Sequence, residues 1–162
     1  MKILMTGATG FTGERLAKQI LVSTDWDIIS LERITVRKNL FLSSPRIHHV
    51  YHDFRAEFPA RLLDEIGPVD YIAHIGAEVH GLRSLENPEL FIHTNVMGTF
   101  NLLEAARVLQ PKMFLYLSSA ETVGSVEDGG SLDEGATLRP SNPYAAAKAA
   151  VDRNTGRALG VF

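Results

Sequence analysis

Three side chains in the C-terminal third of the sequence could move a proton to or from an alcohol. Tyr144 and Lys148 are four residues apart, so on a helix they lie on one face. A neighbouring ammonium favours the phenolate form of tyrosine, and a phenolate can take the proton of an alcohol as hydride leaves its carbon. Ser119, just after an apolar run, could hold the substrate oxygen. The same three residues also fit a surface Tyr–Lys pair and an ordinary loop serine.

The glycine-rich segment 6–13, T-G-A-T-G-F-T-G, could bind the diphosphate of a dinucleotide. Gly7 permits a tight turn, Gly10 lets the backbone approach a diphosphate, and Gly13 lets a helix pack close to a sheet. The N-terminus of that helix offers free N–H groups and a partial positive charge. The residues at this N-terminus are Phe11 and Thr12. Without context, the spacing also fits a simple strand-to-helix turn.

Two acids that follow apolar runs could hold an adenosine. Glu32 could accept hydrogen bonds from the ribose hydroxyls and would repel a 2′-phosphate, which favours NAD over NADP. Asp53 could accept from the adenine amino group. The structural alternative for Glu32 is a solvated acid at a strand end, and the alternative for Asp53 is a turn residue. The basic residues that could weaken the NAD preference are Arg33, Arg37 and Lys38.

Apolar runs alternate with helical stripes along the chain. Strands are expected at 2–6, 26–31, 47–51, 69–75 and 112–118, and helices at 11–22, 56–66, 88–109 and 142–159. Segment 120–141 is expected to be a loop. This alternation predicts an α/β fold with a doubly wound, Rossmann-like parallel sheet in the order 3-2-1-4-5. Its ligand crevice should lie beside the first strand.

Composition excludes several classes of protein. The 162 residues form one expected domain, 1–162, with 45% hydrophobic and 22% charged residues. The net charge of −3 does not favour nucleic acid or an anionic membrane, and no apolar run is long enough to span one. Without Cys there is no thiolate metal site, and the six His form no H-E-x-x-H motif, so no metal is predicted. The lack of Cys also fits a reducing, cytoplasmic location.

Together these features resemble the extended short-chain dehydrogenase/reductase family, the NAD-dependent sugar epimerases and dehydratases. The matching segments are Thr6–Gly13, Glu32, Asp53-Phe54, His74–Ala77, Thr94–Thr99, Ser118-Ser119 and Pro143–Lys148. The resemblance implies that NAD is the cofactor and that Ser119, Tyr144 and Lys148 are the catalytic trio. It further implies cofactor contacts at Phe54, Ile75, Gly76, Ala77, Asn95, Ser118, Tyr144 and Lys148.

Within this family the sequence looks most like the nucleotide-sugar 4,6-dehydratases. These oxidise C4 of the sugar, which acidifies C5–H for removal by a carboxylate. Glu121 could be that base, but Ala120 replaces the acid that dTDP-glucose enzymes carry, and Val123 replaces a usual Tyr. Elimination, decarboxylation and plain 4-epimerisation of a nucleotide sugar therefore all remain open.

The length of the chain suggests a second hypothesis. Family members usually run to about twice 162 residues and carry a substrate lobe, so the last strands and that lobe are expected to be absent. The chain would then be a truncated or non-catalytic NAD-binding module, with its fifth strand at an exposed sheet edge. The resemblance also implies a homodimer through helices 88–109 and 142–159.

Overall fold

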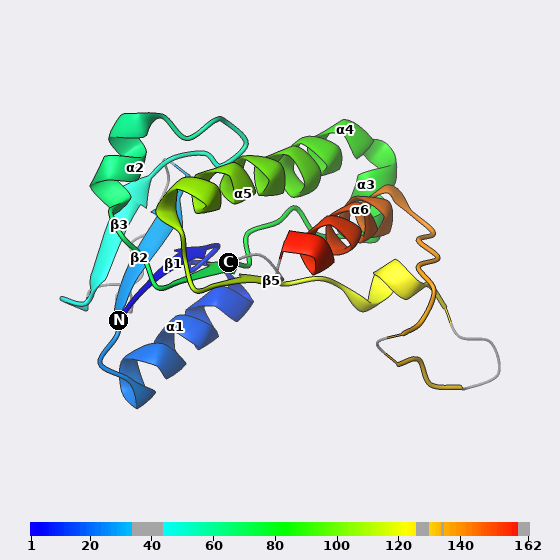
Figure 1. Cartoon of the computed structure of the whole chain (residues 1–162). Helices are drawn as coiled ribbons and strands as arrows, with labels where there is room; N and C mark the ends of the chain where they lie inside the picture. Colours follow the sequence, from blue (N-terminus) through cyan, green and yellow to red (C-terminus); the bar gives the residue numbers. More distant parts are fainter. Residues whose placement is uncertain (34–43, 126–129, 134, 159–162) are drawn as a thin grey trace.

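Five parallel strands form a single sheet. The computed structural model describes residues 1–33, 44–125, 130–133 and 135–158. The strands are β1 (Lys2–Thr6), β2 (Asp27–Glu32), β3 (Ile47–Tyr51), β4 (Tyr71–His74) and β5 (Met113–Tyr116). Their order is β3-β2-β1-β4-β5, which confirms the predicted doubly wound topology (Figure 1). Thr6 pairs with Leu31 on one side and with His74 on the other, so the carboxyl ends of three strands meet at one edge.

Helices cover both faces of the sheet. They are α1 (Phe11–Ser23), α2 (Ala60–Ile66), α3 (Gly81–Glu86), α4 (Pro88–Phe91), α5 (Gly98–Leu109) and α6 (Pro143–Ala158). Helix α1 packs on one face and α2 and α5 on the other (Figure 1). Alternate strand residues point to opposite faces. Leu4, Ile29 and Ile72 therefore join the core beneath α5, while Ile3, Ile28 and Ala73 join the core beneath α1.

The helix predicted at 88–109 is continuous, but its middle residues are wound with a different pitch. Asn87 caps α4 by accepting the Leu90 N–H, and Pro88 occupies the first turn, as expected. Residues Ile92–Met97 then form a π-helix before α5 begins at Gly98. Such π segments are frequent at functional sites, and periodicity cannot reveal one because the apolar stripe continues through it.

Strands and helices elsewhere differ from expectation by at most two residues at their ends, and three differences are larger. Helix α2 begins at Ala60 rather than 56, because Pro59 is extended and restricts the residue before it. Residues Gly81–Glu86, expected to be loop, form α3, and Ala120–Val123 in the predicted loop 120–141 form a 3₁₀ turn. Arg37 and Lys38 lie outside the described residues. Within the described part of the chain, no helix combines the length and apolar character needed to cross a membrane.

Candidate functional site

The glycine turn between β1 and α1 has no room for a side chain at Gly7 or at Gly13. Gly7 has φ +69°, and a Cβ there would lie 2.7 Å from the Gly76 nitrogen. A Cβ on Gly13 would lie 2.0 Å from the Gly7 carbonyl oxygen. The Gly10 N–H donates to that same oxygen at 3.0 Å, which closes the turn. Within the described part of the chain no side chain caps helix α1, so its first-turn N–H groups are available to an anion.

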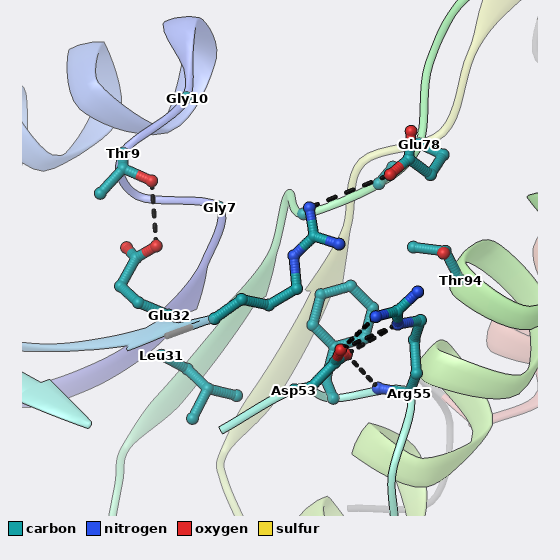
Figure 2. Close-up of a pocket in the computed structure, with 13 residues that line it drawn as sticks. Gly7, Thr9, Gly10, Leu31, Glu32, Asp53, Arg55, Glu78 and Thr94 are labelled. Atoms are coloured by element: carbon teal, nitrogen blue, oxygen red, sulfur yellow. Dashed lines mark hydrogen bonds and ion pairs between the residues drawn. The ribbon is translucent and has the colours of Figure 1, made fainter. Parts of the chain in front are cut away.

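A cleft of about 240 Å³ opens over the carboxyl ends of β1, β2 and β4. It is lined by Gly7, Thr9, Gly10, Leu31, Glu32, Arg33, Asp53, Phe54, Arg55, Gly76, Ala77, Glu78 and Thr94 (Figure 2). Eight of the predicted cofactor residues therefore share one cavity: Gly7, Gly10, Glu32, Arg33, Asp53, Phe54, Gly76 and Ala77. The other predicted residues do not line it: Phe11, Thr12, Gly13, Ile75, Asn95, Ser118, Tyr144 and Lys148.

Glu32 is a buried acid on the wall of this cleft. Its carboxylate accepts from the Thr9 hydroxyl at 2.9 Å and from the Ser30 hydroxyl at 2.6 Å, and Figure 2 shows it facing Thr9. Only 7% of the residue is exposed, which overturns the alternative of a solvated strand-end acid. The two hydroxyls hold the carboxylate beside the glycine turn, and its contact with a ribose stays a prediction.

Asp53 is paired with a residue that the sequence reasoning missed. The Arg55 Nε lies 3.0 and 2.9 Å from the two carboxylate oxygens, and the Arg55 backbone N–H also donates to Asp53. The hydrogen bond from the Arg55 guanidinium lowers the pKa of Asp53. Asp53 is therefore a turn residue, as the structural alternative for it proposed. The Arg55 guanidinium that it holds forms a flat, positively charged part of the cleft wall. The sequence signal for this pair was a basic residue two positions after the acid.

The side chain of Asn95 holds the loop after β4 by two hydrogen bonds. The Asn95 Oδ1 accepts the Glu78 N–H at 2.9 Å and its Nδ2 donates to the Glu78 carbonyl at 2.9 Å. Asn95 thus uses both ends of its amide on this loop, and a direct contact with a cofactor stays a prediction. Thr94 beside it lines the cleft, is 4% exposed, and has no hydrogen-bond partner for its hydroxyl within the described structure. The sequence placed Thr94 in a motif that matches the family, but it gave Thr94 itself no role in the site.

The catalytic candidates gather where β5 ends and α6 begins. Lys148 is 4% exposed, donates to the Leu117 carbonyl at 2.8 Å, and lies 4.7 Å above the centre of the Tyr116 ring. Tyr144, one helical turn earlier, is buried against Phe91 with 6.2 Å between the ring centres. This arrangement overturns the alternative of an exposed Tyr–Lys pair.

Burial changes the acidity of Lys148. Loss of hydration lowers its pKa to about 8, and the negative charge of Asp152 opposes that shift. Asp152 also accepts the Ser118 hydroxyl at 2.7 Å, so Ser118 is held by α6. A lysine with so low a pKa can exist in both protonation states near neutral pH.

Ser119 and Glu121 follow β5 in the 3₁₀ turn. The Ser119 hydroxyl accepts the Glu121 N–H at 3.2 Å and so caps the turn. The Glu121 carboxylate accepts from the Asn142 amide at 2.9 Å, and the Asn142 Oδ1 accepts the Ala145 N–H to cap α6. One asparagine therefore joins the start of the Tyr144 helix to the carboxylate. Among the described residues, no three His, Asp or Glu side chains are arranged to hold a metal ion.

Comparison with known proteins agrees with this geometry. The family model for the NAD dependent epimerase/dehydratase family matches residues 3–158. The chain belongs to this family. Membership confirms the predicted fold class and the predicted dependence on NAD. The turn at Gly7 and Gly13, which admits no Cβ, fits such a dinucleotide, as does the Thr94 hydroxyl, which has no hydrogen-bond partner among the described residues.

Individual relatives include nucleotide-sugar enzymes. A probable dTDP-glucose 4,6-dehydratase of Sinorhizobium fredii is 34% identical over 94% of the chain and 47% of its own length. A low-salt glycan biosynthesis protein, Agl12, of Haloferax volcanii is 35% identical over 94% of the chain and 50% of its own. The chain thus spans about half the length of the curated relatives it matches.

Solved structures show the same relation. The dTDP-glucose 4,6-dehydratase DesIV of Streptomyces venezuelae, with NAD and TYD bound, superposes with a TM-score of 0.85 at 36% identity. The match covers 99% of this chain and 53% of DesIV. UDP-glucose 4-epimerase of Thermus thermophilus, in complex with NAD, gives a TM-score of 0.87 at 27% identity and covers 99% of this chain and 52% of that one.

Proposed function

We propose that the chain forms the cofactor-binding and proton-transfer part of a nucleotide-sugar epimerase/dehydratase. The cleft would take the adenosine diphosphate part of NAD, with the diphosphate at the Gly7–Gly13 turn and the ribose at Glu32. The observation that carries the proposal is the glycine turn beside this cleft, where Gly7 and Gly13 admit no Cβ; the buried Lys148 follows β5 at the same carboxyl edge of the sheet.

When bound, NAD supplies a hydride acceptor for C4 of the sugar. Tyr144 would take the proton of the C4 hydroxyl as the C4–H bond breaks, and Ser119 would hold that oxygen. Lys148 would bind the nicotinamide ribose, on the same face of α6 as Tyr144. Its hydrogen bond to the Leu117 carbonyl supports this role, because it keeps the ammonium on the side of α6 that carries Tyr144.

Glu121 is proposed as the base for a subsequent 4,6-elimination. Once C4 is a ketone, Glu121 would remove the C5 proton and the C6 hydroxyl would leave with a proton from water or another acid. The Asn142 amide supports this assignment because it orients the carboxylate beside the N-terminus of the Tyr144 helix. The first step is the same for an epimerase, so C4 oxidation is the part to test first.

The test is to mix the protein with NAD and UDP-, dTDP- or GDP-hexoses and to follow NADH fluorescence. We expect reduction with at least one sugar class. Tyr144→Phe should lose it by at least about a hundredfold, since general-base catalysis contributes that much. NAD affinity should change little. Tyr71→Phe, at the opposite end of β4, is the matched control and should behave as the unchanged protein. Equal turnover in Tyr144→Phe would remove the assigned role.

The alternative is a non-catalytic NAD-binding module. The finding that favours it is that the chain spans about half the length of its relatives. It predicts NAD binding with no reduction by any of these sugar nucleotides. The same experiment therefore separates the two functions.

We also propose that the chain dimerises through α5 and α6. An apolar groove between them is lined by Val96, Met97, Phe100, Leu103 and Val151, and about half of the Phe100 surface is exposed. Analytical ultracentrifugation should show a dimer at micromolar concentration; a monomer there would refute this. Placement in the cytoplasm stays a prediction.

A further inference from the structure

His74 is a buried polar residue to which neither the family resemblance nor the proposed mechanism gives a role. It ends β4, is 1% exposed, and has the rings of Phe54 and Phe114 packed against it edge-on. Its Nδ1 lies 2.6 Å from the Thr6 hydroxyl and its Nε2 lies 2.9 Å from the Thr99 hydroxyl. Both ring nitrogens are therefore engaged.

The partners of these hydroxyls fix the direction of every hydrogen bond. The Thr6 oxygen already accepts the N–H groups of Ile75 at 3.2 Å and Gly76 at 3.0 Å. A hydroxyl oxygen has two acceptor positions, so the Thr6 proton must point at the His74 Nδ1. The imidazole proton is then on Nε2 and goes to Thr99, whose own proton goes to the Asn95 carbonyl at 2.6 Å.

This chain of bonds runs beneath the cleft from one wall to the other. At one end Thr6 precedes Gly7 and binds the first two amides of the loop after β4. At the other end Asn95 holds the Glu78 backbone of the same loop. The loop approaches the glycine turn so closely that a Cβ on Gly7 would lie within 3 Å of Gly76. Gly7 and Gly76 both line the cleft, so a shift of the loop relative to the glycine turn changes its shape.

We propose that His74, as the neutral Nε2–H tautomer, is a positioning residue for the dinucleotide. It holds the Ile75–Glu78 loop at the spacing from the glycine turn that the cofactor needs. This inference rests on the proposed NAD site and adds a residue that does not touch the ligand. Burial, with the Lys148 charge nearby, lowers the pKa of His74 to about 3, so the imidazole stays neutral wherever the protein works.

The test compares variants that cut the network with ones that preserve it. His74→Phe keeps the ring volume and removes both hydrogen bonds, and Thr6→Val removes the hydroxyl that binds the His74 Nδ1 and the two loop amides. Each should raise the Kd for NAD about tenfold in calorimetry, the effect of mispositioning a hydrogen-bonded contact. Thr6→Ser keeps the hydroxyl and should stay within about twofold.

Phe114→Leu is the matched control for loss of packing. Phe114 contacts the same imidazole but belongs to the apolar core, so its replacement should lower Tm and leave the Kd unchanged. An unchanged Kd in His74→Phe, or an equal loss in Phe114→Leu, would overturn the inference. If the unaltered protein binds no NAD, the proposed cofactor site fails instead.

A second measurement needs no variant. Nitrogen NMR of the unaltered protein should show His74 with its proton on Nε2 and no titration between about pH 5 and 8, the range in which an ordinary histidine titrates. The Ile75 and Gly76 amides should exchange slowly with solvent, and more slowly when NAD is added. A proton on Nδ1, or a titrating ring, would refute the assignment.

Discussion

Strands β2 and β5 lie on opposite sides of the β1–β4 pair and are packed very differently. Five of the six residues of β2 are buried, because helices cover both of its faces. Among the described residues, only the face of β5 toward α5 is covered, and there Phe114 is 1% exposed. On its other face Met113 and Leu115 are each about half exposed. β5 is also the last strand of the sheet, as predicted for the fifth strand.

This difference in packing divides the candidate site into an adenosine side and a proton-transfer side. The adenosine side rests on strands that are packed from both faces within this chain. The proton-transfer side rests on β5, which is packed from one face only among the described residues. Binding of the dinucleotide should therefore depend on rigid close contacts, and the chemistry on a more weakly supported element.

The largest effect should come from filling the glycine turn. In Gly13→Ala the new methyl group would meet the Gly7 carbonyl at 2.0 Å, so backbone has to move. We expect a loss of at least about 3 kcal/mol in the free energy of unfolding, together with loss of NAD binding. Gly10→Ala is the control for the stability effect alone, because its Cβ would lie 3.3 Å from the same oxygen. Urea denaturation and calorimetry measure both. Equal tolerance of the two changes would show that the adenosine side is not rigid.

The free energy of unfolding should depend on pH because of Lys148, on the proton-transfer side. The pKa of Lys148 is about 8 in the folded protein, against 10.5 for an ordinary lysine. Between these values the unfolded chain binds more protons, so this group makes the protein more stable as pH rises from 8 to 10.5 and less stable as pH falls. Relative to Lys148→Met, the unaltered protein should gain about 3 kcal/mol over that range.

Denaturation of both proteins at several pH values measures the difference. Lys112→Met serves as control, because Lys112 lies at the opposite end of β5, is mostly exposed and is paired with Asp70. Parallel stability curves for the unaltered protein and Lys148→Met would mean that Lys148 is well hydrated.

The third prediction tests the packing difference directly. Ile29→Ala in β2 removes a residue that is 3% exposed and should cost about 3 kcal/mol. Leu115→Ala in β5 should cost less than about 0.5 kcal/mol, because the side chain already meets solvent. A large loss at Leu115 would mean that a second chain or segment covers β5 in solution.

The fold was largely predictable because buried strands and amphipathic helices leave local signatures. The run Lys2–Thr6, the glycines after it and the stripe in α1 each specify one part of a βαβ unit. Helix α3 escaped prediction because it is one and a half turns long and begins after His80, whose φ of +89° no pattern announces. The π segment escaped because one extra residue per turn leaves no trace in a short stripe.

The candidate site was predictable to the level of its motifs. The acids Glu32 and Asp53 were found, but the hydroxyls that hold one and the Arg55 that holds the other were not. Partners of this kind come from residues close by in space, and a spacing rule cannot separate a buried, paired carboxylate from a solvated one. Ser119, Glu121, Tyr144 and Lys148 lie around one strand end as expected, and their roles await the experiments above.

By itself, the sequence determined the class of fold, the strand order and the family, because these follow from periodicity and from glycines that admit no side chain. Only the tertiary structure decided the charge states and tautomers. Lys148 has a lowered pKa because α6 buries it against β5, and His74 is neutral because two hydroxyls and three rings enclose it. Hydration and hydrogen bonding are set by neighbours distant in the chain, and these exist only once the sheet has assembled.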